Sequence, residues 1–499
     1  MKYISKIILL FIVLAISSCN EEYLETAPTD QLGADEVLST IVNQRAALEG
    51  IHRYMYGAGG SQDEAGGYGD HMINYDFLGQ DVVNPQRGSG WFIAVHQWLE
   101  HRSNTSSLVN QTYNFYYTII VNANNIINSI DNVEGSADEK NNIKGQAYFY
   151  RAFGHYMLVQ LYAERYKAGQ ANDQLGIVIN LDDLNNLGEA KARSTVDQVY
   201  AQIEADLTTA LQSLNASSVT SSDKSQISKN VVNGMFARVY LTKGEWNNAI
   251  TYAQAARQGF PLTSAAQIQE GFNNYSATGW IWSSRIIPDQ GTYFSSFFAY
   301  MTYNYSSSHI RNNPKCINAD LYDMIPATDV RKGFWAVTQA EMDAIDIPSN
   351  FRKYPYMNTK FKSPGAGTLG DGDVVLMRTA EMILIEAEAN ARLGVANEPA
   401  ARTALFSLVS QRDPNAVIST NTGQALIDEI LVQRRIELWG EGFNFLDLKR
   451  ANLPLKRSTR GSFSLTQARI TDIPAGDLQW QWFFPISAIN VNPNLVQND

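Results

Sequence analysis

The residues that most often carry chemistry in enzymes form no recognisable catalytic motif in this 499-residue sequence. Hydrolysis needs a nucleophile with a base, a pair of carboxylates or a bound metal. Gly88-Ser89-Gly90 lacks the spacing of a nucleophilic serine turn, and Gly57-Ala58-Gly59-Gly60 lacks the lysine of a phosphate-binding loop. His96 and His101 are five positions apart, which separates them on a helix, so we expect both at the surface or in loops. The sequence does not exclude a catalytic pair of carboxylates, because two such residues can meet only in the fold. We nevertheless expect no catalytic residue, cofactor or metal site.

The strongest functional signal is an aromatic segment between Phe272 and Asn313. Eleven of its 42 residues are aromatic, more than twice the 11% of the whole chain, and few of the others are charged. Aromatic rings can cover the flat C–H faces of sugars while neighbouring polar side chains bond to the hydroxyl groups. Trp280 and Trp282 alternate, so in an extended segment both point to the same side. The segment predicts either a sugar-binding surface or the aromatic core of a small subdomain.

The ligand-binding candidates are residues with a polar group in two irregular stretches, since long segments of this kind are usually binding loops or inserted subdomains. In the aromatic segment they are Trp280, Trp282, Tyr293, Tyr300, Tyr303, Tyr305 and Arg311. In an earlier stretch they are Asp81, Arg87, Trp91 and Trp98. Because the aromatic segment offers little charge to bind sulfate or carboxylate groups, we expect a neutral glycan as the ligand.

The charge balance argues against nucleic acid as a partner. Lys and Arg number 39 and Asp and Glu number 50, which gives a net charge of −11. A phosphate-binding surface needs clustered positive charge, and the sequence has no run of five or six basic residues.

The N-terminus predicts a lipid-anchored protein. Lys2 and Lys6 precede an apolar run, residues 7–16, that is too short to span a bilayer but suits a signal peptide. Small residues directly before Cys19 are typical of a bacterial lipoprotein signal. We therefore expect residues 1–18 to be cleaved, Cys19 to carry lipid and residues 19–34 to form an acidic tether. An ordinary secretory signal with an incidental cysteine is the alternative.

Beyond the tether, the hydrophobic periodicity predicts helices. Apolar residues recur at helical spacing in 113–130, 147–162, 195–214, 231–242, 246–258, 376–394, 398–411 and 426–438. Ser194-Thr195-Val196-Asp197 is typical of a helix start and Gly244 of a helix end.

Two of the expected helical hairpins resemble each other. They begin at Phe236 and Ala387, and each has a glycine between its helices and alanines on the second helix, as tetratricopeptide-type pairs do. Generic helical hairpins are the alternative. We expect one body over 35–499, with a scaffold at about 105–260 and 374–450 and loop-rich cargo-binding regions at about 57–104 and 261–373.

Six short motifs follow one another in a specific order. They are Tyr117-x-x-Ile120-x-x-Ala123-Asn124, Ala147 to Phe153 with Leu161-Tyr162, Ala237 to Leu241 with Trp246, Leu376 to Glu381 with Ile385 to Ala389, Arg434 to Leu438 with Asp447 to Arg450, and Phe484-Pro485-Ile486 with Asn492 to Asn498. Each is weak alone. In this order they resemble the SusD/RagB-type outer-membrane nutrient-binding lipoproteins of Bacteroidota.

The resemblance implies an all-α fold, in which tetratricopeptide-like hairpins form a right-handed superhelix and an irregular, loop-rich subdomain binds the ligand. It implies a lipoprotein at the cell surface, anchored in the outer membrane, that captures an oligosaccharide without catalysis. It also implies a partner, a SusC-type TonB-dependent transporter that receives the cargo. A surface glycoside hydrolase and a helical-repeat adaptor for a peptide or protein are the alternatives.

Two positions depart from the charge pattern of the family. Gln433 stands where the family usually has Glu, and Asn444 stands where it usually has Arg. An ion pair lost on both sides leaves no unpaired buried charge, so we expect these two positions to be partners. The remaining charges of the same block are expected to form a helix-packing network.

Overall fold

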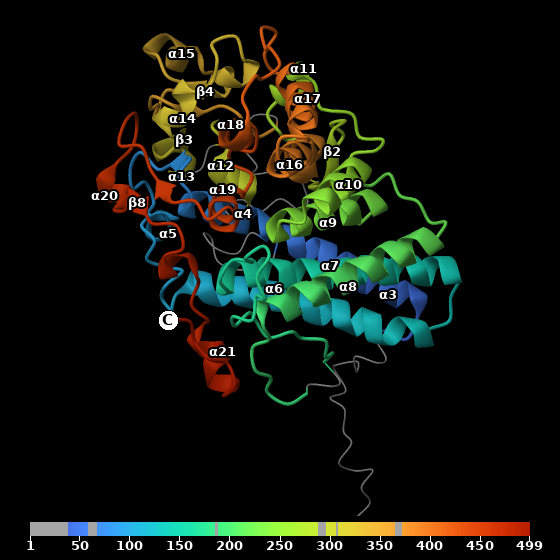
Figure 1. Ribbon diagram of the computed structural model, residues 1–499. Coiled ribbons are helices and arrows are strands. Elements are labelled where there is room, and N and C mark those ends of the chain that lie inside the picture. The colour runs from blue at the N-terminus through green and yellow to red at the C-terminus, as the bar shows by residue number, and fades with distance from the viewer. Residues whose placement is uncertain (1–37, 58–66, 185–187, 288–295, 306–307, 365–371) are drawn as a thin grey trace, which may run out of the picture.

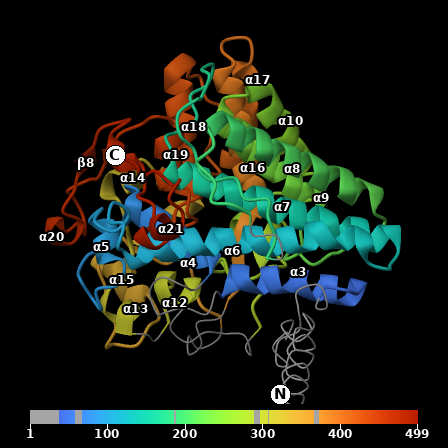
Figure 2. The ribbon, with the colours of Figure 1, turned by 90° about the horizontal axis from the view of Figure 1, so that it is seen from below.

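The computed structural model describes residues 38–57, 67–184, 188–287, 296–305, 308–364 and 372–499, and its long helices pack as neighbouring pairs (Figure 1). The long helices are α3 (Ile41–Tyr56), α4 (Tyr68–Leu78), α6 (Ser107–Ser129), α7 (Ala137–Tyr162), α8 (Val196–Ala216), α9 (Lys229–Lys243), α10 (Trp246–Ala256), α16 (Thr379–Arg392), α17 (Glu398–Val409) and α18 (Gly423–Glu437). The predicted all-α class with helical hairpins is confirmed. Seen from below, α3 runs along α6 and α7 (Figure 2).

Local sequence signals explain where several helices begin and end. The Thr195 hydroxyl accepts the backbone N–H of Gln198 while the Gln198 side chain accepts the N–H of Thr195, which is the capping box that begins α8. Gly244 ends α9 in the left-handed region, at φ 77°. Gly154 lets α6 and α7 approach closely, because a Cβ there would lie 2.6 Å from Ile120 Cγ1.

One expected helix begins later than its hydrophobic stripe suggests. Residues 374–378 form strand β6 (Val374–Arg378), which pairs with β2 (Trp280–Ser284) in an antiparallel ladder, and α16 follows directly. The run of apolar residues at 374–377 is buried on both faces, so its spacing carries no information that separates strand from helix.

The apolar interior has two main parts. The larger cluster runs through α3, α4, α6–α9 and the loop-rich regions. A smaller one joins Ala387 on α16, Leu405 on α17 and Leu426 on α18. Helices α10 and α16 also pack against each other, so the hairpins of the two halves form a continuous helical layer.

Many of the short elements lie around the loop-rich regions, at the upper left of Figure 1. A four-stranded sheet has the order β1-β3-β5-β4, and β7 pairs with β8. The strands are β1 (Val82–Val83), β3 (Cys316–Ile317), β4 (Trp335–Ala336), β5 (Met357–Asn358), β7 (Leu455–Lys456) and β8 (Asp472–Ile473). The short helices are α5 (Ile93–His96), α11 (Ala265–Ile268), α12 (Phe297–Met301), α13 (Ser308–Asn312), α14 (Ala319–Asp323), α15 (Gln339–Ala344), α19 (Asn444–Arg450), α20 (Leu465–Ala468) and α21 (Ile486–Val491).

The charged motif around α18 is a buried packing network, as expected. The Glu437 carboxylate accepts hydrogen bonds from Arg331, Arg378 and Arg412, which reach it from three different segments. Arg378 also donates to Glu441. Because each buried charge has an opposite charge and a hydrogen bond beside it, the network fixes how the loops sit on α18.

The Gln433 and Asn444 pairing predicted from the sequence is wrong. Gln433 Oε1 accepts a hydrogen bond from Arg331, at 2.6 Å. Asn444 Nδ2 donates to Asp81, at 2.8 Å, and its oxygen accepts the backbone N–H of Gln80. The two residues therefore serve different partners, and each amide replaces a charge without leaving a buried group unbonded.

Amides in the carboxyl-terminal segment attach it to the helical layer. Asn498 Nδ2 donates to the backbone oxygens of Tyr162 and Trp482, both at 2.7 Å. Asn492 and Asn494 donate to the backbone oxygens of Lys191 and Ala190. The segment thus ties the end of α7 to the loop that precedes α8.

Candidate functional site

The two loop-rich regions predicted to bind cargo meet at strand β1. Val82 pairs with Ile317 and Val83 with Cys316, so residues more than 200 positions apart lie in one ladder. Next to it, Asn84 Oδ1 accepts hydrogen bonds from Lys315 Nζ at 2.8 Å and from Asn313 Nδ2 at 3.2 Å. Burial lowers the pKa of the Lys315 ammonium to about 7. These contacts fix one loop against the other.

The turn after β1 brings the loops into closer contact still. Gly88 has φ 54°, and a Cβ there would lie 2.8 Å from Asn313 Cβ, so the close approach requires glycine. Gln86 donates to the backbone oxygen of Asn312. The Gly90 N–H donates to the Arg87 oxygen and closes the turn, which leaves the Arg87 side chain exposed.

An aromatic ring stands beside this turn. Trp91 is half-buried and packs edge-to-face on Tyr300, with 5.5 Å between ring centroids. Tyr300 belongs to α12 and is fully buried, as is Tyr305. Phe92 also packs edge-to-face on Tyr300, with 5.0 Å between ring centroids. Trp91 therefore rests on a rigid aromatic base while part of its ring reaches the surface.

Two further predicted residues stand at the same junction. Tyr303 is half-buried and packs against the cluster that includes Val83 and Cys316. Burial and the charge of Asp346 raise the pKa of its phenol, so it stays a neutral hydrogen-bonding group. Arg311 is half-buried next to Asn312. We call Arg87, Trp91, Tyr303 and Arg311 the loop-junction surface; its side chains combine one accessible ring with donors suited to sugar hydroxyls.

Two of the predicted residues near β1 lie inside the protein. The Asp81 carboxylate is bound by Arg435, with 2.6 Å between Oδ1 and Nη2. Trp98 is buried, donates from Nε1 to the Leu78 oxygen and packs edge-to-face on Trp480. Both residues position the loop from within.

The paired tryptophans of the aromatic segment are packed in the larger core cluster. Trp280 and Trp282 are 2% and 1% exposed. The Trp282 ring contacts Phe149 and Phe153 on α7 edge-to-face, at 5.3 and 5.6 Å. This packing favours the second of the two interpretations of the segment, an aromatic core, for these two rings. Tyr293 and Cys19 lie outside the described residues.

The two histidines expected at the surface or in loops do not reach the surface, since His96 and His101 are 1% and 0% exposed. His101 lies in a turn, as expected, whereas His96 belongs to the short helix α5. Burial lowers the pKa of His101 to about 3, so the ring is neutral, and Gln479 accepts its hydrogen bond. Within the described ranges no three His, Cys, Asp or Glu side chains gather in a way that could hold a metal ion. None of the helices described is long and apolar enough to cross a membrane.

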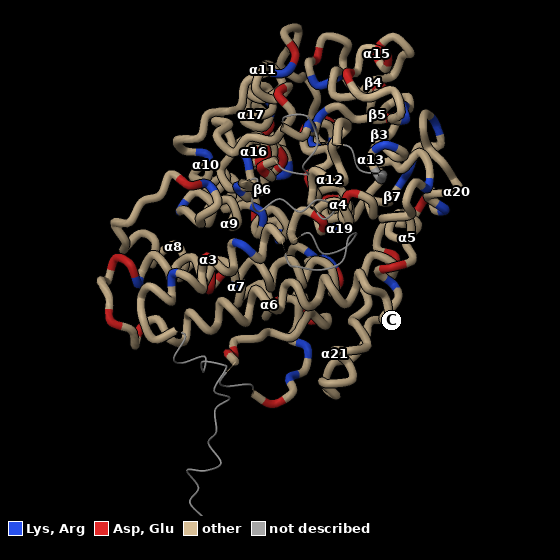
Figure 3. Tube along the Cα trace, turned by 180° about the vertical axis from the view of Figure 1, so that it is seen from behind, with Lys and Arg blue, Asp and Glu red and all other residues tan. Residues whose placement is uncertain are grey.

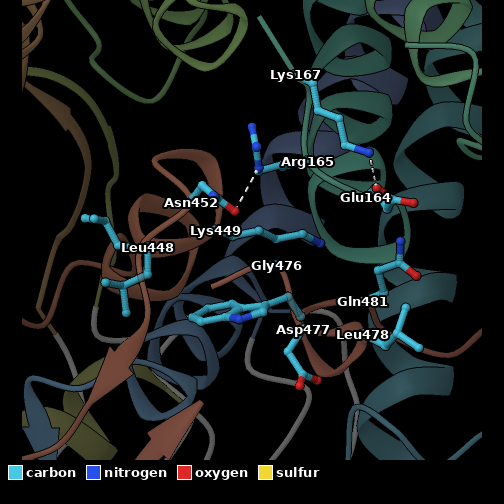
Figure 4. Close-up of a pocket in the computed structure, with 12 residues that line it drawn as sticks. Glu164, Arg165, Lys167, Leu448, Lys449, Asn452, Gly476, Asp477, Leu478 and Gln481 are labelled. Carbon is cyan, nitrogen blue, oxygen red and sulfur yellow. Dashed lines mark hydrogen bonds and ion pairs between the residues drawn. The ribbon is translucent and has the colours of Figure 1, made fainter. Parts of the chain in front are cut away.

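A separate cavity of about 220 Å³ lies between the end of α7, α19 and the loop at 476–481. Figure 4 shows Lys449 crossing it near the Arg165–Asn452 and Lys167–Glu164 pairs. Lys449 Nζ donates to the backbone oxygens of Gln160 and Leu161, the last carbonyls of α7. Because these contacts already engage Lys449 and the two neighbouring pairs, we interpret this cavity as a place where the end of α7 packs against α19, and not as a ligand site.

Sequence reasoning missed Asn84, Asn313 and Lys315, which join the two loops. No pattern marks them, because a hydrogen bond between residues more than 200 positions apart leaves no local spacing. Lys and Arg are interspersed with Asp and Glu along the part of the chain drawn in colour in Figure 3.

Comparisons with known proteins agree on one family. A family profile described as "Starch-binding associating with outer membrane" matches residues 64–241, and the profile of the SusD family matches residues 289–499. The chain is 23% identical over 489 residues to SusD-like protein P2 of Formosa agariphila, which covers 90% of both chains.

Solved structures of similar shape cover nearly the whole chain. One is a SusD-like carbohydrate binding protein from Bacteroides vulgatus, with a TM-score of 0.78, 25% identity and coverage of 92% of this chain and 97% of that one. Another is a SusD superfamily protein from Bacteroides thetaiotaomicron, with a TM-score of 0.76, 23% identity and coverage of 92% and 100%.

Proposed function

The chain belongs to the SusD/RagB family, and from this membership we propose that it is a cell-surface lipoprotein that binds a glycan. It captures an oligosaccharide and delivers it to a SusC-type TonB-dependent outer-membrane transporter, and it catalyses no reaction. The description of the first matching profile supports the link to glycans and to the outer membrane, and the printed name of the similar carbohydrate binding protein from Bacteroides vulgatus supports the link to glycans.

The observation that carries the proposal is the half-buried Trp91, which packs edge-to-face on the buried Tyr300 ring and lies four residues after the exposed Arg87 on the loop-junction surface. A ring fixed on a buried aromatic base offers a flat apolar area without losing side-chain entropy on binding. Arg87 and Arg311 belong to the same surface and carry guanidinium donors for hydroxyl oxygens. Such a surface suits a neutral oligosaccharide, because hydroxyls need donors and acceptors rather than a full opposite charge.

The test is calorimetric titration of the purified protein with neutral oligosaccharides from a glycan-array screen. Trp91→Ala should weaken binding by about 1–3 kcal/mol, the range of a well-packed aromatic contact. The matched control is Trp246→Ala, since Trp246 is a half-buried tryptophan on the helical layer, at the start of α10. Equal affinity in the Trp91 variant and the wild type would place the glycan elsewhere.

Two further measurements separate the proposal from its alternatives. Incubation of the protein with the bound glycan should leave the glycan intact, and release of shorter sugars would identify a glycoside hydrolase instead. Purification from membranes in mild detergent should recover the transporter with the protein. Recovery of a peptide or soluble protein, with no affinity for sugars, would support the adaptor alternative.

A further inference from the structure

A second pocket lies apart from the loop-junction turn, between α3 and strand β2. Its volume is about 330 Å³, at the lower end of the range of about 300–1,000 Å³ typical of ligand pockets. Its polar lining includes His52, Arg53, Ser283 and Arg285, and Tyr150 and Trp282 contribute to its wall. The size suits one sugar ring better than a chain of several.

Two buried polar groups in this lining lack a hydrogen-bond partner in the described part of the chain. Ser283 is completely buried, and its hydroxyl oxygen has none. The His52 side chain is 8% exposed; its Nδ1 lies 3.2 Å from the Glu49 carboxylate, and its Nε2 has no hydrogen-bond partner. A buried polar group left without a hydrogen bond destabilises the fold, so these two groups favour a polar ligand group in the pocket.

Two exposed guanidinium groups border the same pocket. Arg53 lies over the ring of Tyr56 at 4.9 Å, and Arg285 lies over the ring of Tyr275 at 4.8 Å. Among the residues described, neither arginine has an ion pair or a hydrogen bond through its side chain, in contrast to Arg378 and Arg412 in the buried network. A planar guanidinium held on an aromatic face is well placed to bind an oxyanion through two parallel hydrogen bonds.

The one carboxylate in the lining has other partners. Glu49 lies 3.2 Å from His52 and accepts a hydrogen bond from Gln226 at 3.1 Å. The hydrogen bond to His52 keeps the pKa of Glu49 below its ordinary value, so the group stays charged. The lining itself therefore holds two arginines and one engaged carboxylate, while Asp373 near Arg285 and Asp223 near Glu49 lie outside it.

We propose that this pocket binds an oxyanion substituent, a carboxylate or a sulfate ester, carried by a sugar ring. Arg53 and Arg285 bind the oxyanion, and Ser283 and His52 bond to ring hydroxyls. The inference rests on the proposed role in glycan capture and deepens it. The protein then accepts an acidic residue of a glycan in this pocket, in addition to the neutral part that contacts Trp91.

The first experiment compares ligands that differ only in charge. Tetragalacturonate and its fully methyl-esterified form are titrated into the wild type, and a sulfated galactan tetrasaccharide is compared with its desulfated form. We expect the charged member of at least one pair to bind at least tenfold more tightly, and that advantage to shrink with added salt. The pair that shows the difference identifies the oxyanion. Equal affinities within both pairs would overturn the proposal.

The second experiment assigns the effect to the pocket. Arg53→Gln combined with Arg285→Gln should abolish the advantage of the charged ligand. Arg352→Gln, which changes an exposed arginine outside the pocket, should preserve it. Ser283→Ala should weaken the charged ligand severalfold without lowering the melting temperature, because the hydroxyl it removes has no partner in the fold. An unchanged charge advantage in the double arginine variant would contradict the proposal.

Failure of this inference can be distinguished from failure of the proposed function. Neutral oligosaccharide that binds the wild type and the double arginine variant equally, but not the Trp91→Ala variant, supports glycan capture whatever happens in the pocket. Charged ligand that binds the Trp91→Ala variant with full affinity would support the pocket and contradict the role of the loop-junction surface.

Discussion

The Arg435 guanidinium and the Asp81 carboxylate form an ion pair, with 2.6 Å between Nη2 and Oδ1, that ties the base of the Trp91 loop to helix α18. Asp81 is 3% exposed at its side chain and Arg435 is 21% exposed. Asn444 donates to the same carboxylate, and Trp439 donates to the Asp81 backbone oxygen. The scaffold thus holds the binding loop through a residue that sequence reasoning placed among the ligand contacts.

Removing the positive partner of this pair should destabilise the protein. Arg435→Met leaves a buried carboxylate with only Asn444 beside it, and we expect a loss of about 3 kcal/mol in the free energy of unfolding. Adding Asp81→Asn to the same variant should restore part of that loss, which urea denaturation would measure. Arg460→Met, in an exposed pair with Asp320, is the control and should change nothing measurable. A neutral effect of Arg435→Met would show that the loop does not depend on the pair.

Trp282 should behave as a core residue. Trp282→Ala removes a ring packed against α7, and we expect unfolding to become easier by about 3–5 kcal/mol. Affinity for neutral oligosaccharides, measured per folded molecule, should stay unchanged. Thermal melting and calorimetric titration of the same sample measure the two effects. Reduced affinity with an unchanged melting temperature would instead place the ring in the binding surface.

Asp76 should make stability fall as the pH rises. Burial raises the pKa of its carboxyl from an ordinary 3.8 to about 8, although the N–H groups of Gly442 and Asn444 donate to it. Between about pH 4 and pH 8, the native state therefore keeps a proton that the unfolded chain has already released. The stability that this proton confers is fully present below pH 4 and is lost as the pH approaches 8.

Asp76→Asn keeps the site neutral at every pH, so it isolates this effect. Relative to the variant, the wild type should lose up to about 1.4 kcal/mol for each pH unit in that window, as measured by urea denaturation from pH 5 to pH 8. Asp472→Asn, at an exposed position on β8, should show no such trend. A difference between wild type and Asp76→Asn that is constant across pH would contradict the assignment.

The lipid anchor predicted from the N-terminus can be tested with the two cysteines of the sequence. Cys19→Ala should abolish incorporation of labelled fatty acid and release the protein from the membrane fraction. Cys316→Ala should keep both the label and the membrane location, because Cys316 is a buried thiol in β3. Membrane retention of the Cys19 variant without label would reveal another anchor.

The sequence predicted the scaffold better than the site, for a physical reason. Helices are set by local spacing and by caps. The box expected at 194–197 lies one residue before the observed box of Thr195 and Gln198 at the start of α8, and Gly244 ends α9 as expected. The expected helix at 376–394 includes residues 376–378, which belong to strand β6. A fully buried apolar run has no periodicity that separates strand from helix.

For the candidate site, residue type could not separate exposed rings from buried ones. Trp91 and Trp98 have the same chemistry, and only the packing of Trp98 on Trp480 makes it a core residue. The partners of Asp81 and Asn84 likewise come from segments far away in the chain. Long-range contacts of this kind leave no mark in the spacing of either segment.

The attachment of Asn498 to the backbone oxygens of Tyr162 and Trp482 limits where the gene can be altered. A stop codon only a few positions early would remove Asn492, Asn494 and Asn498 and free the loop before α8 from the end of α7. Such a truncation would destabilise the protein. Natural variants at these three asparagines should therefore be as rare as variants in the helices.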